Sequence, residues 1–193
     1  RFSVAGFSAP RTDFSGQAVP FAIDPEQKGE MRGWHKMEFD DSAWKKIRLG
    51  TYWENQGITM QNPKFQPRLG APYDGDAFYR IAVVIPESWK GRKLYLEAGP
   101  IDDLDRPWFN GVMIGETTEV VPKYWELVRR YPIPSESIRW GKKNEIALRV
   151  RDLRYHGGIL GVFRVTDGSA SGESALFYPL PSRLIYRFDP NAW

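Results

Sequence analysis

The sequence predicts an all-β protein, a sandwich of two antiparallel sheets, and three observations point to it. First, 18 glycines and 15 prolines are spread along the 193 residues, as the turns between many short strands require. Second, short runs of β-branched and aromatic residues recur, with turn residues every 8–12 positions, which is typical of sandwiches and barrels. Third, no helical period persists for more than about two turns.

Seven strands are expected in the regular part of the chain. Residues 77–85 (AFYRIAVVI) are β-branched and aromatic and end at Pro86. Residues 93–98 (KLYLEA) alternate between apolar and polar side chains, as a half-buried strand does. Asn110-Gly111 is the strongest hairpin signal in the sequence. The seven expected strands are 77–85, 93–98, 106–109, 112–116, 125–133, 144–150 and 159–165.

The remaining segments are expected to be irregular. Residues 1–30 and 54–76 are rich in glycine, proline and polar residues, and the second stretch is interpreted as a long loop. Between them, Asp40 is placed to cap a single turn that brings Trp44 onto the core before the chain extends. The expected division is an N-terminal segment 1–33 that packs on or leads into the sandwich, the sandwich 34–166, and a C-terminal loop with a last strand or linker, 167–193.

Composition excludes several classes of protein. Acidic and basic residues are interspersed, with a net charge of +3 and no dense lysine or arginine run, which argues against nucleic-acid binding. There is no cysteine, hence no disulfide or thiolate metal site, and no run of 18 apolar residues, hence no expected membrane span. No glycine-rich phosphate-binding motif occurs. Aromatics are abundant, with eight tryptophans, and such flat side chains can stack on sugar rings as well as fill a core.

The order of the strands sorts the loops into two ends of the sandwich. If successive strands run antiparallel, residues 54–76, 99–105, 117–124 and 151–158 meet at one end, which we call the near rim. Binding residues are commonly carried by loops on a rigid scaffold, so the near rim is the expected site. Its candidate ligand-binding residues are Tyr73, Asp74, Asp102, Asp103, Tyr124, Trp125, Asp152, Arg154, Tyr155 and His156.

Alternatives remain for several of these residues. The main alternative for Asp102, Asp103 and Asp105 is to cap turns or to pair with Arg129 or Arg149. A structural calcium site is a further, less favoured alternative. Asp152 at a strand end could brace its loop instead of meeting a ligand. His156 has no partner at metal-ligand spacing, so no metal-binding residue is assigned. No catalytic residue is assigned either, because no motif organises the carboxylates into a site.

An ordered series of short motifs resembles a known domain. Asp40-Asp41-Ser42-Ala43-Trp44, Trp53-Glu54-Asn55-Gln56-Gly57 and Asp74-Gly75-Asp76-Ala77-Phe78-Tyr79-Arg80 resemble the sugar-binding jelly roll that opens many family 2 glycoside hydrolases. The second half resembles a related domain within bacterial sialate O-acetylesterases, through the runs 99–105, 108–117, 130–134, 141–152 and 157–159. The resemblance covers about residues 34–165 and implies a galactose-binding-like, jelly-roll β-sandwich.

The catalytic parts of those enzymes have no counterpart here. The esterases carry a Gly-Asp-Ser nucleophile block that this sequence lacks, and a glycosidase barrel needs far more chain. The resemblance therefore implies a non-catalytic carbohydrate-binding module, not an enzyme, held to the catalytic domain of an exported bacterial polysaccharide-degrading enzyme. In the family 2 enzymes the segment resembling Asp152 to Ile159 faces the neighbouring domain's sugar site. A structural module without sugar affinity is the second hypothesis, and a stand-alone glycosidase or lyase the third.

Overall fold

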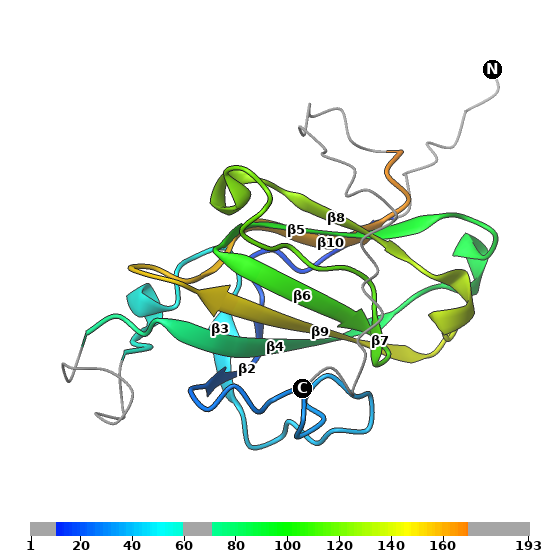
Figure 1. Cartoon of the computed structure of the whole chain (residues 1–193). Helices are drawn as coiled ribbons and strands as arrows, with labels where there is room; N and C mark the ends of the chain where they lie inside the picture. The colour runs from blue at the N-terminus through cyan, green and yellow to red at the C-terminus, as the bar shows by residue number, and fades with distance from the viewer. Residues whose placement is uncertain (1–10, 60–70, 170–193) are drawn as a thin grey trace, which may run out of the picture.

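The computed structural model describes residues 11–59 and 71–169 as two antiparallel sheets packed face to face (Figure 1). In order across the first sheet lie β1 (Arg11–Asp13), β10 (Gly158–Thr166), β5 (Leu94–Asp102) and β8 (Arg129–Ile133). In order across the second lie β3 (Lys45–Arg48), β2 (Ala18–Asp24), β4 (Gly75–Val84), β9 (Lys143–Asp152), β6 (Leu104–Phe109) and β7 (Val112–Met113).

Helical structure is confined, over the described residues, to four single 3-10 turns: η1 (Glu54–Gln56), η2 (Glu87–Trp89), η3 (Tyr124–Glu126) and η4 (Ser135–Ser137). None of the helices in this part of the chain has the length and apolar character needed to cross a membrane. The all-β sandwich predicted from the turn spacing is confirmed.

The main core fills the space between the sheets. β4 and β9 pair along their whole length, from Gly75 opposite Asp152 to Val84 opposite Lys143. Alternate residues of these strands, such as Tyr79 and Leu148, point inward and are buried against the facing sheet. Removing each such large apolar side chain from water contributes about 1.5–3 kcal/mol.

A second, smaller core lies on the opposite face of the six-stranded sheet. Phe78 of β4 and Trp108 of β6 are buried there, and Trp34 and Trp44 pack against them. The segment between β2 and β3, in blue below the sheet in Figure 1, covers this face. Residues 76–81 of β4 are buried on both faces of the sheet, so this part of the strand does not alternate between buried and exposed side chains.

Arg80 holds this covering segment to the sheet. Its side chain is buried, and its guanidinium donates to the backbone oxygens of Trp34 at 2.6 Å and Lys36 at 2.9 Å. It also donates to Asp41 Oδ2 at 2.8 Å. Asp40 caps the following turn as predicted, accepting a hydrogen bond from the Ser42 N–H.

The structure corrects the expectation that residues 1–30 are irregular, because β1 and β2 lie within them. β2 pairs with both β3 and β4, with Phe21 opposite Tyr79 and Pro20 opposite Lys46. These strands belong to the same sheets as the rest of the sandwich. Their partners lie far away in sequence, so local periodicity does not reveal them.

Three other expected boundaries are wrong. Residues 99–105 are mostly strand, since β5 continues to Asp102 and β6 begins at Leu104. The expected strand 125–133 begins only at Arg129, after the η3 turn, and the expected strand 112–116 is reduced to β7. The Asn110-Gly111 turn is confirmed, with φ angles of 49° and 82°. The expected loop and last strand beyond residue 169 lie outside the described residues.

Candidate functional site

The predicted near rim is assembled by the strand pairing. Gly75 pairs with Asp152, Leu104 with Arg151, and Gly158 with Asp102, so the ends of five strands meet at one end of the sandwich. The loop between β9 and β10, the η1 turn and the η3 turn all lie at this end, on the left of Figure 1. Residues that the sequence places far apart are therefore brought together.

The loop between β9 and β10 is fixed in place by Trp53. This indole is fully buried, and a Cβ built on Gly157 would lie 2.0 Å from it. The backbone N–H of Trp53 also donates a hydrogen bond to the backbone oxygen of Gly157 at 2.9 Å. Only glycine fits at position 157, so the contact sets the path of the loop. At its tip Tyr155 has a φ of 77° and is 71% exposed.

Asp152 ends β9 directly beneath this loop and is only 2% exposed. Its Oδ1 accepts a hydrogen bond from the Arg154 N–H at 2.8 Å. Its Oδ2 is buried and has no hydrogen-bond partner among the described residues. Burial, with the nearby carboxylates of Asp74, Glu54 and Asp103, raises the pKa of Asp152 to about 8. At neutral pH the group is therefore largely a neutral carboxylic acid, able to donate a hydrogen bond.

Asp102 and Asp103 form the turn between β5 and β6 beside Asp152. Asp103 Oδ2 accepts from the Leu153 N–H at 2.9 Å, which ties this turn to the loop after β9. Burial and the adjoining Asp103 carboxyl raise the pKa of Asp102 to about 7. Asp103 thus has a structural partner, and Asp102 adds a second carboxyl that is half protonated near neutral pH.

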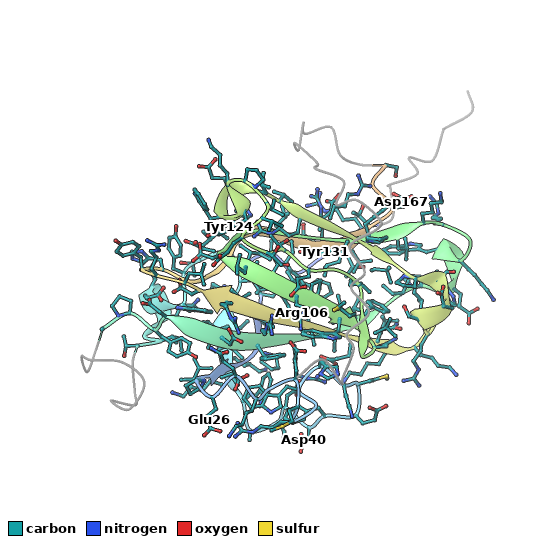
Figure 2. The ribbon with its side chains drawn as sticks, in the orientation of Figure 1. Glu26, Asp40, Arg106, Tyr124, Tyr131 and Asp167 are labelled. Atoms are coloured by element: carbon teal, nitrogen blue, oxygen red, sulfur yellow. The ribbon has the colours of Figure 1, made fainter. Side chains whose placement is uncertain are left out.

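Arg129 connects the acidic turn to η3 from below. Its guanidinium donates to Asp105 Oδ1 at 2.8 Å and to the backbone oxygens of Ile101 and Asp103 at 3.0 and 2.8 Å. It also donates to the backbone oxygen of Tyr124 in η3. Of the alternatives for Asp105, pairing with Arg129 is the one observed. Figure 2 shows Tyr124 at the η3 turn.

Aromatic side chains lie around the acidic groups. Tyr124 and Trp125 contact edge to face, with centroids 4.9 Å apart, and Trp125 is 44% exposed. His156 packs on the ring of Tyr52 at 5.0 Å. Tyr155 and Trp125 thus offer apolar faces to solvent, while Arg154 is exposed and supplies a cation.

The other two candidates differ from each other. Tyr73 is buried, and its hydroxyl donates to the Asp76 backbone oxygen at 2.7 Å, so it supports the rim but presents no ring face. Asp74 is exposed at the start of β4. Within residues 11–59 and 71–169, no group of three or more His, Asp or Glu side chains is arranged to hold a metal ion. A structural calcium ion stays a prediction.

One rim residue was missed as a site candidate. Glu54 begins η1, accepts a hydrogen bond from the Gly157 N–H at 3.2 Å, and has its pKa raised by burial. The sequence could have indicated Glu54, because it directly follows Trp53 in the second motif. A buried tryptophan also restricts the position of the residue next to it.

Comparison with known proteins relates this sandwich to parts of larger enzymes. No protein-family model matches the chain. A β-galactosidase from Psychromonas ingrahamii is 28% identical over 90 residues, which are 41% of this chain and 8% of that protein. The β-glucuronidase of Ruminococcus gnavus superposes on 86% of this chain with a TM-score of 0.64 at 15% identity. A glycosyl hydrolase family 2 member from Bacteroides cellulosilyticus superposes on 81% with a TM-score of 0.62 at 21% identity.

In each case the chain spans a minor part of its relative. It corresponds to 30% of the Ruminococcus chain and 20% of the Bacteroides chain. At these identities the superpositions establish the fold. The resemblance seen in the sequence motifs is confirmed at that level: the described residues form a β-sandwich like that of a domain within family 2 glycoside hydrolases.

Proposed function

We propose that this chain is a non-catalytic carbohydrate-binding domain of a larger glycoside hydrolase and that the near rim is its sugar site. The observation that carries the proposal is Asp152, a buried carboxyl at the floor of the rim, one of whose oxygens has no hydrogen-bond partner within residues 11–59 and 71–169. Buried polar atoms are nearly always hydrogen-bonded, so an unpartnered carboxyl oxygen at this end of the sandwich fits a ligand hydroxyl as its missing partner.

The rim matches the chemistry of a sugar. A hydroxyl both donates and accepts, and a partly protonated pair such as Asp102 and Asp152 can do the same. Aromatic faces at Trp125 and Tyr155 suit the apolar face of a pyranose ring. The catalytic domain of the parent enzyme is the proposed second partner, since the chain spans only a fraction of each relative. An extracytoplasmic, bacterial location follows from the resemblance and is part of the proposal.

A structural module is the alternative function. The same geometry would let the loop after β9 complete a sugar site on an adjoining catalytic domain without binding sugar alone. The supporting observation is that the rim loops are tied together internally, by Arg129 and by the Trp53–Gly157 contact, as a prebuilt surface requires.

A glycan-binding screen of the purified chain, read by tryptophan fluorescence and calorimetry, separates the two. Saturable binding that falls at least tenfold in Asp152→Asn and Tyr155→Ala would support the rim site. The matched control is Asp167→Asn, a carboxylate that pairs with Arg92 beyond the opposite end of β10. Binding that survives both rim variants would place the site elsewhere. A flat response across the panel would favour the structural module.

A further inference from the structure

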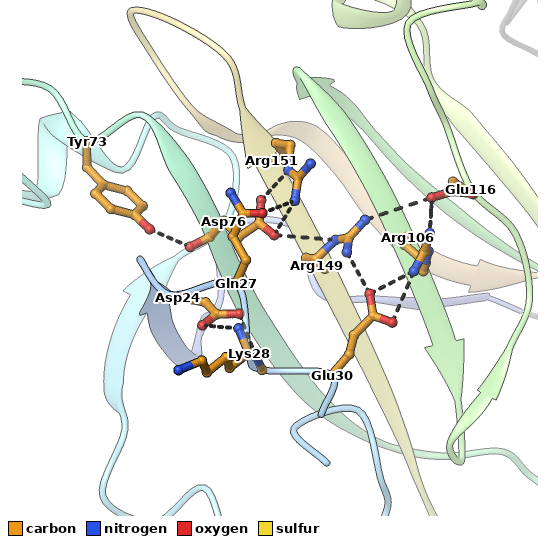
Figure 3. Close-up of polar contacts among 11 residues, drawn as sticks. Asp24, Gln27, Lys28, Glu30, Tyr73, Asp76, Arg106, Glu116, Arg149 and Arg151 are labelled. Carbon is orange, nitrogen blue, oxygen red and sulfur yellow. Dashed lines mark hydrogen bonds and ion pairs between the residues drawn. The ribbon is translucent and has the colours of Figure 1, made fainter. Parts of the chain in front are cut away.

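A polar cleft of about 320 Å³ lies on the face of the six-stranded sheet that points away from the main core. This size is at the lower end of small-ligand sites. Figure 3 shows its side chains converging from β4, β9, β6 and the segment after β2. The cleft is lined by Asp24, Gln27, Glu30, Met31, Asp76, Arg106, Arg149 and Arg151.

In the cleft, each arginine lies beside a carboxylate, so that positive and negative side chains alternate. Arg151 donates to both oxygens of Asp76, at 2.5 and 2.9 Å. Glu30 accepts from Arg106 at 2.8 Å and from Arg149 at 2.6 Å. Glu116 at its edge accepts a further hydrogen bond from Arg106. The cleft therefore contains three arginines and three lining carboxylates, and Glu116 adds a fourth carboxylate at its edge. It holds no excess of positive charge.

Hydrogen-bonding capacity is left over in this network. Arg149 Nε is buried without a hydrogen-bond partner in the described part of the chain, and it lies 3.9 Å from the nearest Asp76 oxygen. Burial and the adjoining Arg106 lower the pKa of Arg149, though an arginine stays charged in the physiological range. Gln27 lines the cleft and accepts a hydrogen bond from Arg151 with its Oε1 at 3.1 Å, and its amide N–H₂ group can donate further hydrogen bonds.

We infer that this cleft is a second saccharide subsite, which binds a neutral sugar unit. An anion would meet four carboxylates and would have to displace one of them from an arginine. A neutral polyol can insert its hydroxyls between donors and acceptors that alternate at this spacing. The exposed side chain of Met31 offers an apolar contact at the edge. The subsite stands on its own residues and does not depend on the near rim.

The position of the cleft gives the subsite a relation to the rim. Arg151 and Asp152 are neighbours on β9, and consecutive side chains of a strand point to opposite faces. The cleft and the near rim are therefore adjacent along β9, with Arg151 in the cleft and Asp152 in the rim. A glycan longer than one unit that occupied the rim would have a second contact within reach on the same domain.

The test is an amide NMR titration of the whole chain with galactose, glucose and xylose up to about 100 mM, because a ligand of so few atoms binds weakly. Glucuronate and sulfate are the anionic probes. We expect a neutral sugar to shift the resonances of Gln27, Glu30, Arg149 and Arg151. Gln27→Asn, which tolerates the φ of 55° at this position, should weaken that binding several-fold. Asp152→Asn and Tyr155→Ala are the controls and should leave these shifts in place.

A second variant tests the charge argument. Glu116→Gln removes one carboxylate while keeping a hydrogen-bond acceptor for Arg106, and should raise affinity for glucuronate relative to glucose by roughly fivefold. Absence of shifts at these residues with all neutral sugars would overturn the inference, whatever happens at the rim. Tighter binding of sulfate or glucuronate than of any neutral sugar by the unmodified chain would overturn it too.

Discussion

Arg129 and Asp105 form an ion pair that is almost completely buried, with side chains 3% and 0% exposed and the Nε and Oδ1 atoms 2.8 Å apart. Tyr131 donates its hydroxyl to the other oxygen of Asp105. The pair thus lies between the acidic turn of the near rim and η3. Arg129 fixes the positions of both through its hydrogen bonds to their backbone oxygens.

Removing Arg129 should therefore destabilise the protein strongly. In Arg129→Met the buried Asp105 charge loses its partner, which we expect to lower the free energy of unfolding by about 3–5 kcal/mol. Chemical denaturation of the variant measures this. Adding Asp105→Asn should recover part of the loss, because the orphaned charge disappears. Arg11→Met, which breaks an exposed pair with Asp13, is the control and should cost less than about 1 kcal/mol. Additive losses in the double variant would contradict the coupling.

The raised pKa of Asp152 predicts that stability falls with pH. The folded protein holds a proton at Asp152 up to about pH 8, whereas the unfolded chain releases it near the ordinary value of 3.8. The folded state therefore binds more protons between these limits, and unfolding becomes easier as the pH rises through them. Asp152→Asn should remove this decline, which is on the order of 5 kcal/mol between pH 4 and pH 8. The free energy of unfolding is measured by chemical denaturation at several pH values across this range. If the Asp152 carboxyl were ionised throughout, the variant and the unmodified protein would show the same dependence on pH.

Gly157 should not accept a side chain. Its added Cβ would lie 2.0 Å from the Trp53 ring, which is fully buried and unable to retreat. We expect Gly157→Ala to cost about 1–3 kcal/mol and to shift the near-ultraviolet circular dichroism of the tryptophans. Gly57→Ala is the matched control: its Cβ would meet nothing within 4 Å, and only its φ of 78° opposes alanine, at about 1 kcal/mol. Equal losses in the two variants would rule out the steric argument.

Arg80 should govern the segment that covers the second core. Arg80→Met would leave the backbone oxygens of Trp34 and Lys36 without their donor, along with Asp41. We expect a loss of about 3 kcal/mol and faster amide hydrogen exchange across residues 34–44. Arg92→Met, an exposed residue paired with Asp167, provides the comparison and should leave exchange unchanged. Protection that persists in Arg80→Met would show that aromatic packing alone holds the segment.

The sequence allowed the fold class and the grouping of loops at the near rim to be predicted, because both depend on local patterns. Alternation in residues 93–98 and the Asn110-Gly111 turn are properties of short stretches. β2 was missed because its place is set by pairing with β4, more than 50 residues away in sequence. The course of residues 99–105 was also missed: they were expected to form a loop, because glycine and proline are uncommon inside strands, yet β5 continues through Gly99 and Pro100.

The candidate site divides in the same way. The residue types and their common end of the sandwich could be predicted, but burial could not. Tyr73 and Asp74 adjoin in sequence, yet one is buried and the other exposed. The cleft around Arg149 escaped prediction because it combines four separate stretches of chain, none with a motif of its own.

β3 has a further consequence for how the protein behaves at high concentration. It is an edge strand of the six-stranded sheet and carries Lys45, Lys46 and Arg48, all exposed, around the single buried Ile47. A second chain adding its own strand here would have to bring its β3 lysines against these, and the repulsion opposes such growth. The far edge is closed by β7, only two residues long. Both borders of this sheet are thereby protected against the edge-to-edge association that leads β-rich proteins to aggregate.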